Sequence, residues 1–160
     1  MDNDNKWLTI YVDAGFGNGV GTYGIWIRIQ PGRRTFEGTL PPVANNNEAE
    51  MQAIVLGLEY GLKFWAEHYE EPPRGITIAT DSNHARTRFS KDALPLITGS
   101  GRPISSTEKE IFARFKKLQH PAVPVRFKPL KGHSSRRTVS GWLNSWCDRA
   151  ATKARKQGTP

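Results

Sequence analysis

Residues 8–15 read LTIYVDAG, a hydrophobic segment that ends in an acid. Every second side chain of its first half is apolar, at Leu8, Ile10 and Val12. This period of two predicts a strand over 7–12 with one face against a core. Asp13 then lies at the end of that strand, where a carboxylate is difficult to bury unless a proton or a cation compensates its charge.

Turn signals and apolar periodicity predict the remaining elements, beginning with a glycine-rich loop over 14–22. Further strands are expected at 23–30, 34–40, 75–80 and 123–127. Helices are expected from Asn46 or Asn47 to about Tyr69, over 84–89, after the capping-box pair Ser105 and Glu108, and in a final segment with Trp142, Leu143, Trp146, Ala150 and Ala154. The step from a long helix to a strand indicates a parallel crossover. The fold class is therefore α/β, with a five-stranded mixed sheet.

The chain of 160 residues is expected to form a single domain, with 1–5 and 157–160 as disordered tails. No apolar run reaches the roughly 18 residues of a membrane span, so no membrane association is expected. Cys147 is the single cysteine, which excludes a disulfide framework and indicates a reducing compartment. We therefore expect a cytoplasmic protein, and a monomer.

Charge is distributed unevenly along the chain. Residues 1–83 carry 6 Lys+Arg and 11 Asp+Glu, a balance of −5, whereas 84–160 carry 17 and 4, a balance of +13, which together give the net +8. Such a basic half could hold a phosphate backbone and predicts a polyanionic partner. The alternative is a solvated basic surface that binds nothing.

Four acids form the candidate site: Asp13, Glu50, Asp81 and Asp148. Two lie at the ends of predicted strands and two on predicted helices, in the order strand, helix, strand, helix. If they meet at one point, each pair repels by several kcal/mol in a medium of intermediate dielectric, so protons or cations must bind. Hard oxygen ligands suit Mg²⁺ or Mn²⁺. The arrangement predicts a two-metal site that cleaves phosphodiesters.

Four phrases of the sequence, in this order, resemble type 1 ribonuclease H from about residue 7 to 155: IYVDAG, NNEAEMQAIVLGLE, TDSNHAR, and KGHSS with NSWCDRAA. The resemblance implies the ribonuclease H-like fold, with strand order 3-2-1-4-5 and helices on both faces. It also implies sequence-non-specific hydrolysis of the RNA strand of an RNA–DNA hybrid with two Mg²⁺ ions, Mn²⁺ being possible.

The resemblance also assigns roles to individual residues. Asp13, Glu50, Asp81 and Asp148 match the metal-binding carboxylates, and His133 matches a catalytic histidine on a loop. Contacts to the hybrid are expected from Gly15, Asn18, Asn45, Asn46, Asn47 and Asn83. The chain departs from the family in its nearly uncharged stretch LPLITGSGRPIS, where many bacterial members have a basic protrusion.

Each assignment has a structural alternative. Glu50 could be a capping-box acid, Asp13 and Asp81 could cap turns, Asp148 could be a surface acid, and His133 could be merely exposed. Two rival functions also stay open. One is a DNA-cutting nuclease of the same superfamily, similar to resolvases or transposases, and the other is a hybrid-binding module without catalysis.

Overall fold

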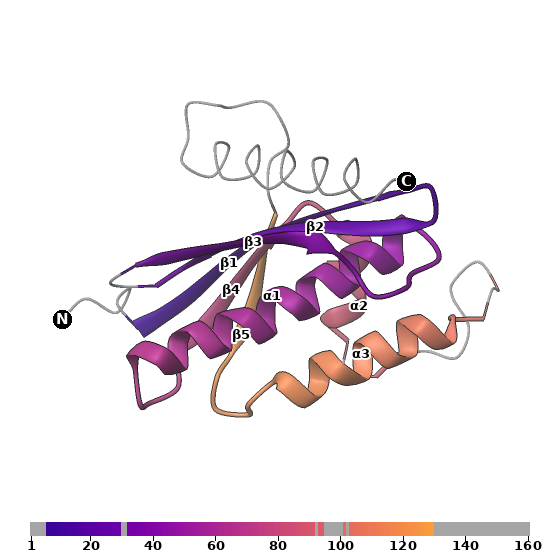
Figure 1. Cartoon of the computed structure of the whole chain (residues 1–160). Coiled ribbons are helices and arrows are strands. Elements are labelled where there is room, and N and C mark those ends of the chain that lie inside the picture. The colour runs from indigo at the N-terminus through magenta and orange to yellow at the C-terminus, as the bar shows by residue number, and fades with distance from the viewer. Residues whose placement is uncertain (1–5, 30–31, 92, 95–100, 102, 130–160) are drawn as a thin grey trace.

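A five-stranded mixed sheet forms the centre of the computed structural model, which describes residues 6–29, 32–91, 93–94, 101 and 103–129. Its strands are β1 (Trp7–Gly17), β2 (Val20–Arg28), β3 (Arg33–Thr39), β4 (Gly75–Thr80) and β5 (Val125–Pro129). They lie in the order β3-β2-β1-β4-β5 (Figure 1). β1 pairs antiparallel with β2 and parallel with β4. The predicted strand order and the parallel crossover are therefore confirmed.

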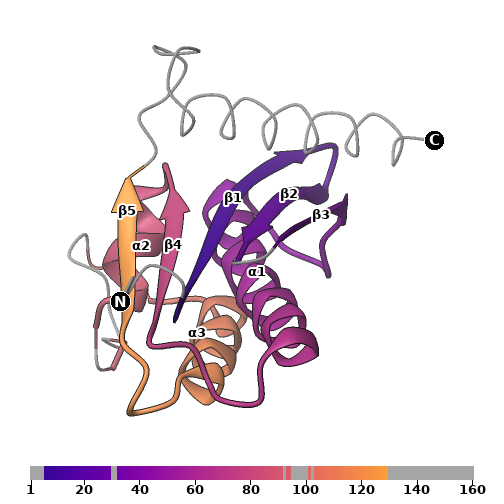
Figure 2. The same cartoon turned by 90° about the vertical axis from the view of Figure 1, so that its left-hand side faces the viewer.

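Three helices cover one face of this sheet, as both views show (Figures 1 and 2). They are α1 (Asn46–His68), α2 (Asn83–Phe89) and α3 (Ser106–Leu118). The resemblance implied helices on both faces of the sheet. The final predicted helix lies outside the described residues. No helix in the described part of the chain has the length and apolar character needed to span a membrane.

The core lies between the sheet and α1, and two glycines bring this helix unusually close to β1. A Cβ atom added at Gly57 would lie 3.0 Å from the Cγ2 atoms of Ile10 and Val12. One added at Gly61 would lie 2.9 Å from Ile10 Cδ1. A larger residue at either position would force these β1 side chains to shift. The close approach fixes α1, and with it the acids near its N-terminus, against the central strand.

A stack of aromatic rings fixes α2 and α3 on the other half of the sheet. The ring centroids of Phe89 and Phe115 are 4.2 Å apart, and Phe127 of β5 lies 6.0 Å from Phe115. Phe89 and Phe115 are fully buried. Burial of each large aromatic side chain stabilises the fold by roughly 2 to 3 kcal/mol, so this cluster holds the short helix α2 in place.

The predicted loop at 14–22 is wrong, because β1 and β2 continue through it as one hairpin. Asn18 and Gly19 have φ angles of +54° and +77°, and only these two residues connect the strands. Left-handed backbone at both central positions is the two-residue turn that matches strand twist. Gly15 and Gly21 therefore pair within the ladder, opposite Thr22 and Phe16.

Smaller differences concern where elements begin. Helix α1 has Asn45 as its N-cap rather than Asn46 or Asn47, and α2 begins at Asn83 rather than His84. β3 begins one residue before its predicted start. β5 begins at Val125 rather than 123, because parallel pairing with β4 sets Val125 opposite Ile76. β4 has the predicted bounds.

Candidate metal centre

Asp13 is held in the middle of β1 rather than at its end. The parallel pairing of β1 with β4 stops at Tyr11, so Asp13 lies just beyond it while β1 continues beside β2. The carboxylate is buried, and its Oδ1 accepts a hydrogen bond of 2.9 Å from the amide of Ala14. A carboxylate therefore faces the edge where β4 ends.

Glu50 comes from the N-terminal part of α1, and the helix does not use it as a cap. The N-cap Asn45 accepts a 2.9 Å hydrogen bond from the amide of Glu48 through Oδ1. Glu48 in turn accepts a 2.9 Å bond from the amide of Ala44. Glu48 is thus the acid that satisfies the helix start, and the capping alternative for Glu50 is wrong. Glu50 Oε2 is buried and has no hydrogen-bond partner among the described residues.

Asp81 is the first residue after β4, in the turn that leads into α2. The amide of Ser82 donates to Thr80 Oγ1 over 3.1 Å, and Ser82 Oγ accepts from the amide of Ala85 over 3.1 Å. Ser82 is therefore the N-cap of α2, which leaves Asp81 exposed at the strand end. The cap of this helix is therefore Ser82 and not Asp81.

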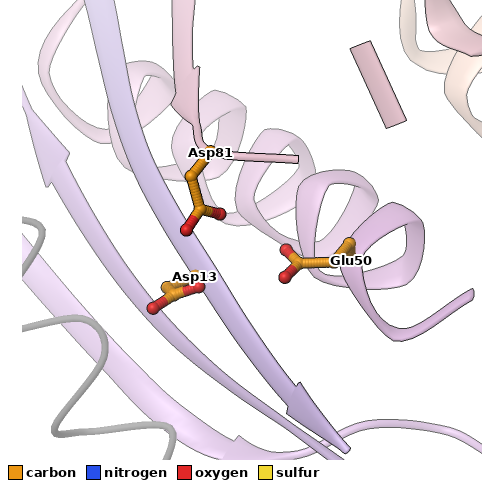
Figure 3. A group of neighbouring side chains, drawn as sticks. All are labelled: Asp13, Glu50 and Asp81. Carbon is orange, nitrogen blue, oxygen red and sulfur yellow. The ribbon is translucent and has the colours of Figure 1, made fainter. Parts of the chain in front are cut away.

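The structure brings these three carboxylates together (Figure 3). One oxygen from each of Asp13, Glu50 and Asp81 lies within 4.8 Å of the others. Burial, and then the negative charges of Asp13 and Asp81, raise the pKa of Glu50 from 4.5 to about 9. Three converging hard oxygen donors are the ligands that Mg²⁺ and Mn²⁺ prefer. The donor set therefore fits a divalent cation, and without one Glu50 holds a proton at neutral pH.

Two further predicted site residues, Asp148 and His133, lie outside the described residues. The six predicted substrate contacts lie in two regions. Gly15 and Asn18 belong to the β1–β2 hairpin, and Asn45, Asn46, Asn47 and Asn83 are exposed at the starts of α1 and α2. The side chain of Asn45 is already engaged as a cap, and that of Asn83 accepts from Arg86. Their contacts to a hybrid stay predictions.

Sequence reasoning missed the contacts that join the starts of α1, α2 and α3 through four polar residues: Glu48, His84, Ser105 and Glu108. Ser105 and Glu108 were predicted as a capping box, and Ser105 does cap α3. Glu108 instead directs its carboxylate to His84 of α2. Only the capping pattern was visible in the sequence, since the partners are 24 and 57 residues apart.

The fold and the site together define a class of protein. It is a mixed α/β protein whose acids, from the central strand, the end of the neighbouring parallel strand and the start of the crossover helix, form a candidate cation site at one edge of the sheet. The chain belongs to the ribonuclease H family, whose model matches residues 5–156, and it is accordingly a ribonuclease H enzyme.

Solved structures share this fold across nearly the whole chain. Ribonuclease H1 from the halophilic archaeon Halobacterium salinarum is 16% identical, with a TM-score of 0.64 over 95% of this chain and 99% of the other. The N-terminal ribonuclease H domain of a Mycobacterium tuberculosis protein, solved fused to maltose-binding protein, is 14% identical, with a TM-score of 0.65 over 96% and 99%. LC11-RNase H1 in complex with an RNA/DNA hybrid, a compost metagenome protein, is 17% identical, with a TM-score of 0.60 over 92% and 99%. The comparison with curated proteins found no match.

Proposed function

We propose that this chain is an endoribonuclease that hydrolyses the RNA strand of RNA–DNA hybrids without sequence preference, with two divalent cations. The observation that carries the proposal is the convergence of Asp13, Glu50 and Asp81, with one oxygen of each within 4.8 Å of the others. Asp148 would complete the set, as the resemblance to type 1 ribonuclease H implies. Bound Mg²⁺, or Mn²⁺, would supply an activated water and neutralise charge on the departing oxygen.

The protein's own groups prepare the site for that chemistry. Asp13 is fixed by the amide of Ala14, and Glu50 by a helix that lies tight against β1. Fixed carboxylates hold cations without reorganising, which supports electrostatic stabilisation of a charged transition state. Glu50 must lose its proton when a cation binds, because its pKa of about 9 keeps it neutral otherwise. His133 would transfer protons or assist product release.

A hybrid substrate is supported by charge and by a relative. One protein of the same fold is known in complex with an RNA/DNA hybrid. The half of the chain from 84 to 160 carries a balance of +13, which suits contact with phosphates. Asn46 and Asn47 are exposed in the first turn of α1, the helix that carries Glu50, and can both donate and accept hydrogen bonds. Contacts of this kind to 2′-hydroxyl groups would distinguish RNA from DNA.

Four substrates of one sequence test this function with Mg²⁺: an RNA–DNA hybrid, an RNA duplex, a DNA duplex and single-stranded RNA. Cleavage confined to the RNA strand of the hybrid is expected. Asp13→Asn is the matched control, because it removes one ligand charge and keeps nearly the same shape, so contaminating nucleases would show as residual activity. Comparable cleavage of the DNA duplex would replace the proposal with the resolvase-like alternative, and binding without cleavage would leave a hybrid-binding module.

A further inference from the structure

The first turns of α1 and α3 are joined by one serine hydroxyl. Ser105, the N-cap of α3, donates to Glu48 Oε2 over 3.1 Å and accepts from the amide of Glu108 over 3.1 Å. Both hydrogen-bonding functions of the hydroxyl are therefore occupied. Glu48 is only 3% exposed. A buried carboxylate is destabilising unless its oxygens are hydrogen-bonded, so this contact constrains the position of both helix starts.

The path continues from α3 to α2 through a second buried acid. Glu108 is 7% exposed, and its Oε1 lies 2.5 Å from His84 Nε2, within hydrogen-bond distance. Arg88 Nε lies 3.9 Å from the other oxygen of Glu108 and forms an ion pair with it. The side chain of Glu108 therefore joins α3 to two residues of α2.

Both ends of this polar path lie close in sequence to acids of the candidate metal centre. Glu48 lies two residues before Glu50 on α1. His84 lies in the first turn of α2, the helix that follows Asp81. Among the described residues, no hydrogen bond or ion pair joins α1 directly to α2. α3 therefore supplies the polar connection between the element that carries Glu50 and the turn that carries Asp81.

A connection of this kind is needed because the acids repel one another. One carboxylate oxygen of each of Asp13, Glu50 and Asp81 lies within 4.8 Å of the others. When all three are ionised, repulsion acts to move α1 away from the β4–α2 turn. A link through Glu48, Ser105, Glu108 and His84 opposes that movement, because it ties the start of α1 to α2 through α3.

We propose that Ser105 and Glu108 are positioning residues, which act through Glu48 and His84 to hold Glu50 and Asp81 at the spacing that one divalent cation requires. The proposal rests on the cation site of the proposed function. Residues that orient metal ligands without touching the metal commonly change metal affinity by about 10- to 100-fold when they are replaced. Because the path acts through helix starts, its loss should weaken cation binding by roughly tenfold, the lower end of that range.

Four variants distinguish loss of the polar path between α1 and α2 from loss of the N-cap of α3. Ser105→Ala removes both, while Ser105→Thr keeps a hydroxyl that can donate and accept, and should restore wild-type behaviour. His84→Ala breaks the far end of the path and leaves the cap of α3 intact. Glu110→Gln is the matched control, because it removes an exposed carboxylate from the same helix without touching the path.

The primary measurement is the affinity for Mn²⁺ in the absence of nucleic acid, detected by electron paramagnetic resonance. A second assay measures hybrid cleavage as a function of Mg²⁺ concentration. Ser105→Ala and His84→Ala should each weaken Mn²⁺ binding roughly tenfold. The Mg²⁺ concentration that gives half-maximal cleavage should rise in parallel. The KM for hybrid should be unchanged, and kcat should recover at saturating Mg²⁺. The double variant should be no worse than either single one, because both break the same path.

Mn²⁺ affinity within twofold of wild type in His84→Ala would overturn the proposal, as would additive effects in the double variant. If Ser105→Ala does not fold, His84→Ala alone decides. A wild-type protein that neither binds Mn²⁺ nor cleaves hybrid would instead remove the proposed function, and this inference with it. The two failures are therefore distinguishable.

Discussion

Replacing Glu50 by glutamine should stabilise the metal-free protein, by an amount that depends on pH. Burial and two neighbouring carboxylates raise the pKa of Glu50 from 4.5 to about 9. A group whose pKa is raised on folding makes its full contribution to stability when the pH is below its pKa in the unfolded chain. That contribution is lost as the pH rises towards its pKa in the folded protein. Wild-type stability should therefore decrease between about pH 4.5 and 9 through this residue.

The size of the effect follows from the pKa values. Each pH unit inside this window corresponds to about 1.4 kcal/mol. At pH 7 the unfolded chain has ionised Glu50, whereas the folded metal-free protein still holds the proton. Glu50→Gln keeps a neutral side chain of the same shape in both states. Its free energy of unfolding should therefore exceed that of wild type by at most about 3 kcal/mol at pH 7 and by nearly nothing at pH 4.5.

Urea unfolding in excess chelator, at several pH values from 4.5 to 8, measures this difference. Glu110→Gln, which removes an exposed carboxylate, controls for the loss of one negative charge. Addition of Mg²⁺ should remove or reverse the difference in stability between Glu50→Gln and wild type, because ions that bind the folded wild type stabilise it by mass action. A stability difference that does not change with pH would refute the reasoning, since it would mean that Glu50 is ionised in the folded protein.

Other predictions follow from the site and from the turn. Asp13→Asn should nearly abolish hybrid cleavage while thermal unfolding shows an intact fold, and turnover by wild type in excess chelator would contradict this. His133→Ala should lower kcat by about one to two orders of magnitude with hybrid affinity unchanged; an unaltered kcat would make this histidine merely exposed. Hybrid affinity should fall with salt at a log–log slope near −0.9 per phosphate contacted, and Lys117→Gln should reduce the slope if that exposed lysine touches phosphate. Gly19→Val should destabilise by about 1 to 3 kcal/mol in urea unfolding, because its φ of +77° strains a β-branched residue.

The parts of the fold that local patterns determine could be predicted from the sequence. β4 is a short apolar strand bounded by Pro72-Pro73 and Asp81, and its predicted bounds are correct. Ser105 and Glu108 lie at capping spacing, and α3 begins where they indicate. Such features depend on interactions within a few residues, so the sequence contains them directly.

The parts that depend on distant partners could not be predicted. Glycines at 15, 17, 19 and 21 suit a loop and a hairpin equally, and only pairing between β1 and β2 decides between them. Glu108 fits a capping box, but its carboxylate binds His84 across the interface of two helices. In the candidate site, strand ends indicated Asp13 and Asp81, whereas their distance from Glu50 depends on how closely α1 packs on the sheet.

The two-residue turn at Asn18 and Gly19 limits how this hairpin can vary in length. β1 is held on its other side by β4, so a single inserted residue at the tip would shift β2 rather than β1. A shift by one residue exchanges the two faces of a strand, which would turn Ile25 and Ile27 out of the core. Natural or engineered variants should therefore lengthen the tip by even numbers, or absorb an odd residue in a bulge.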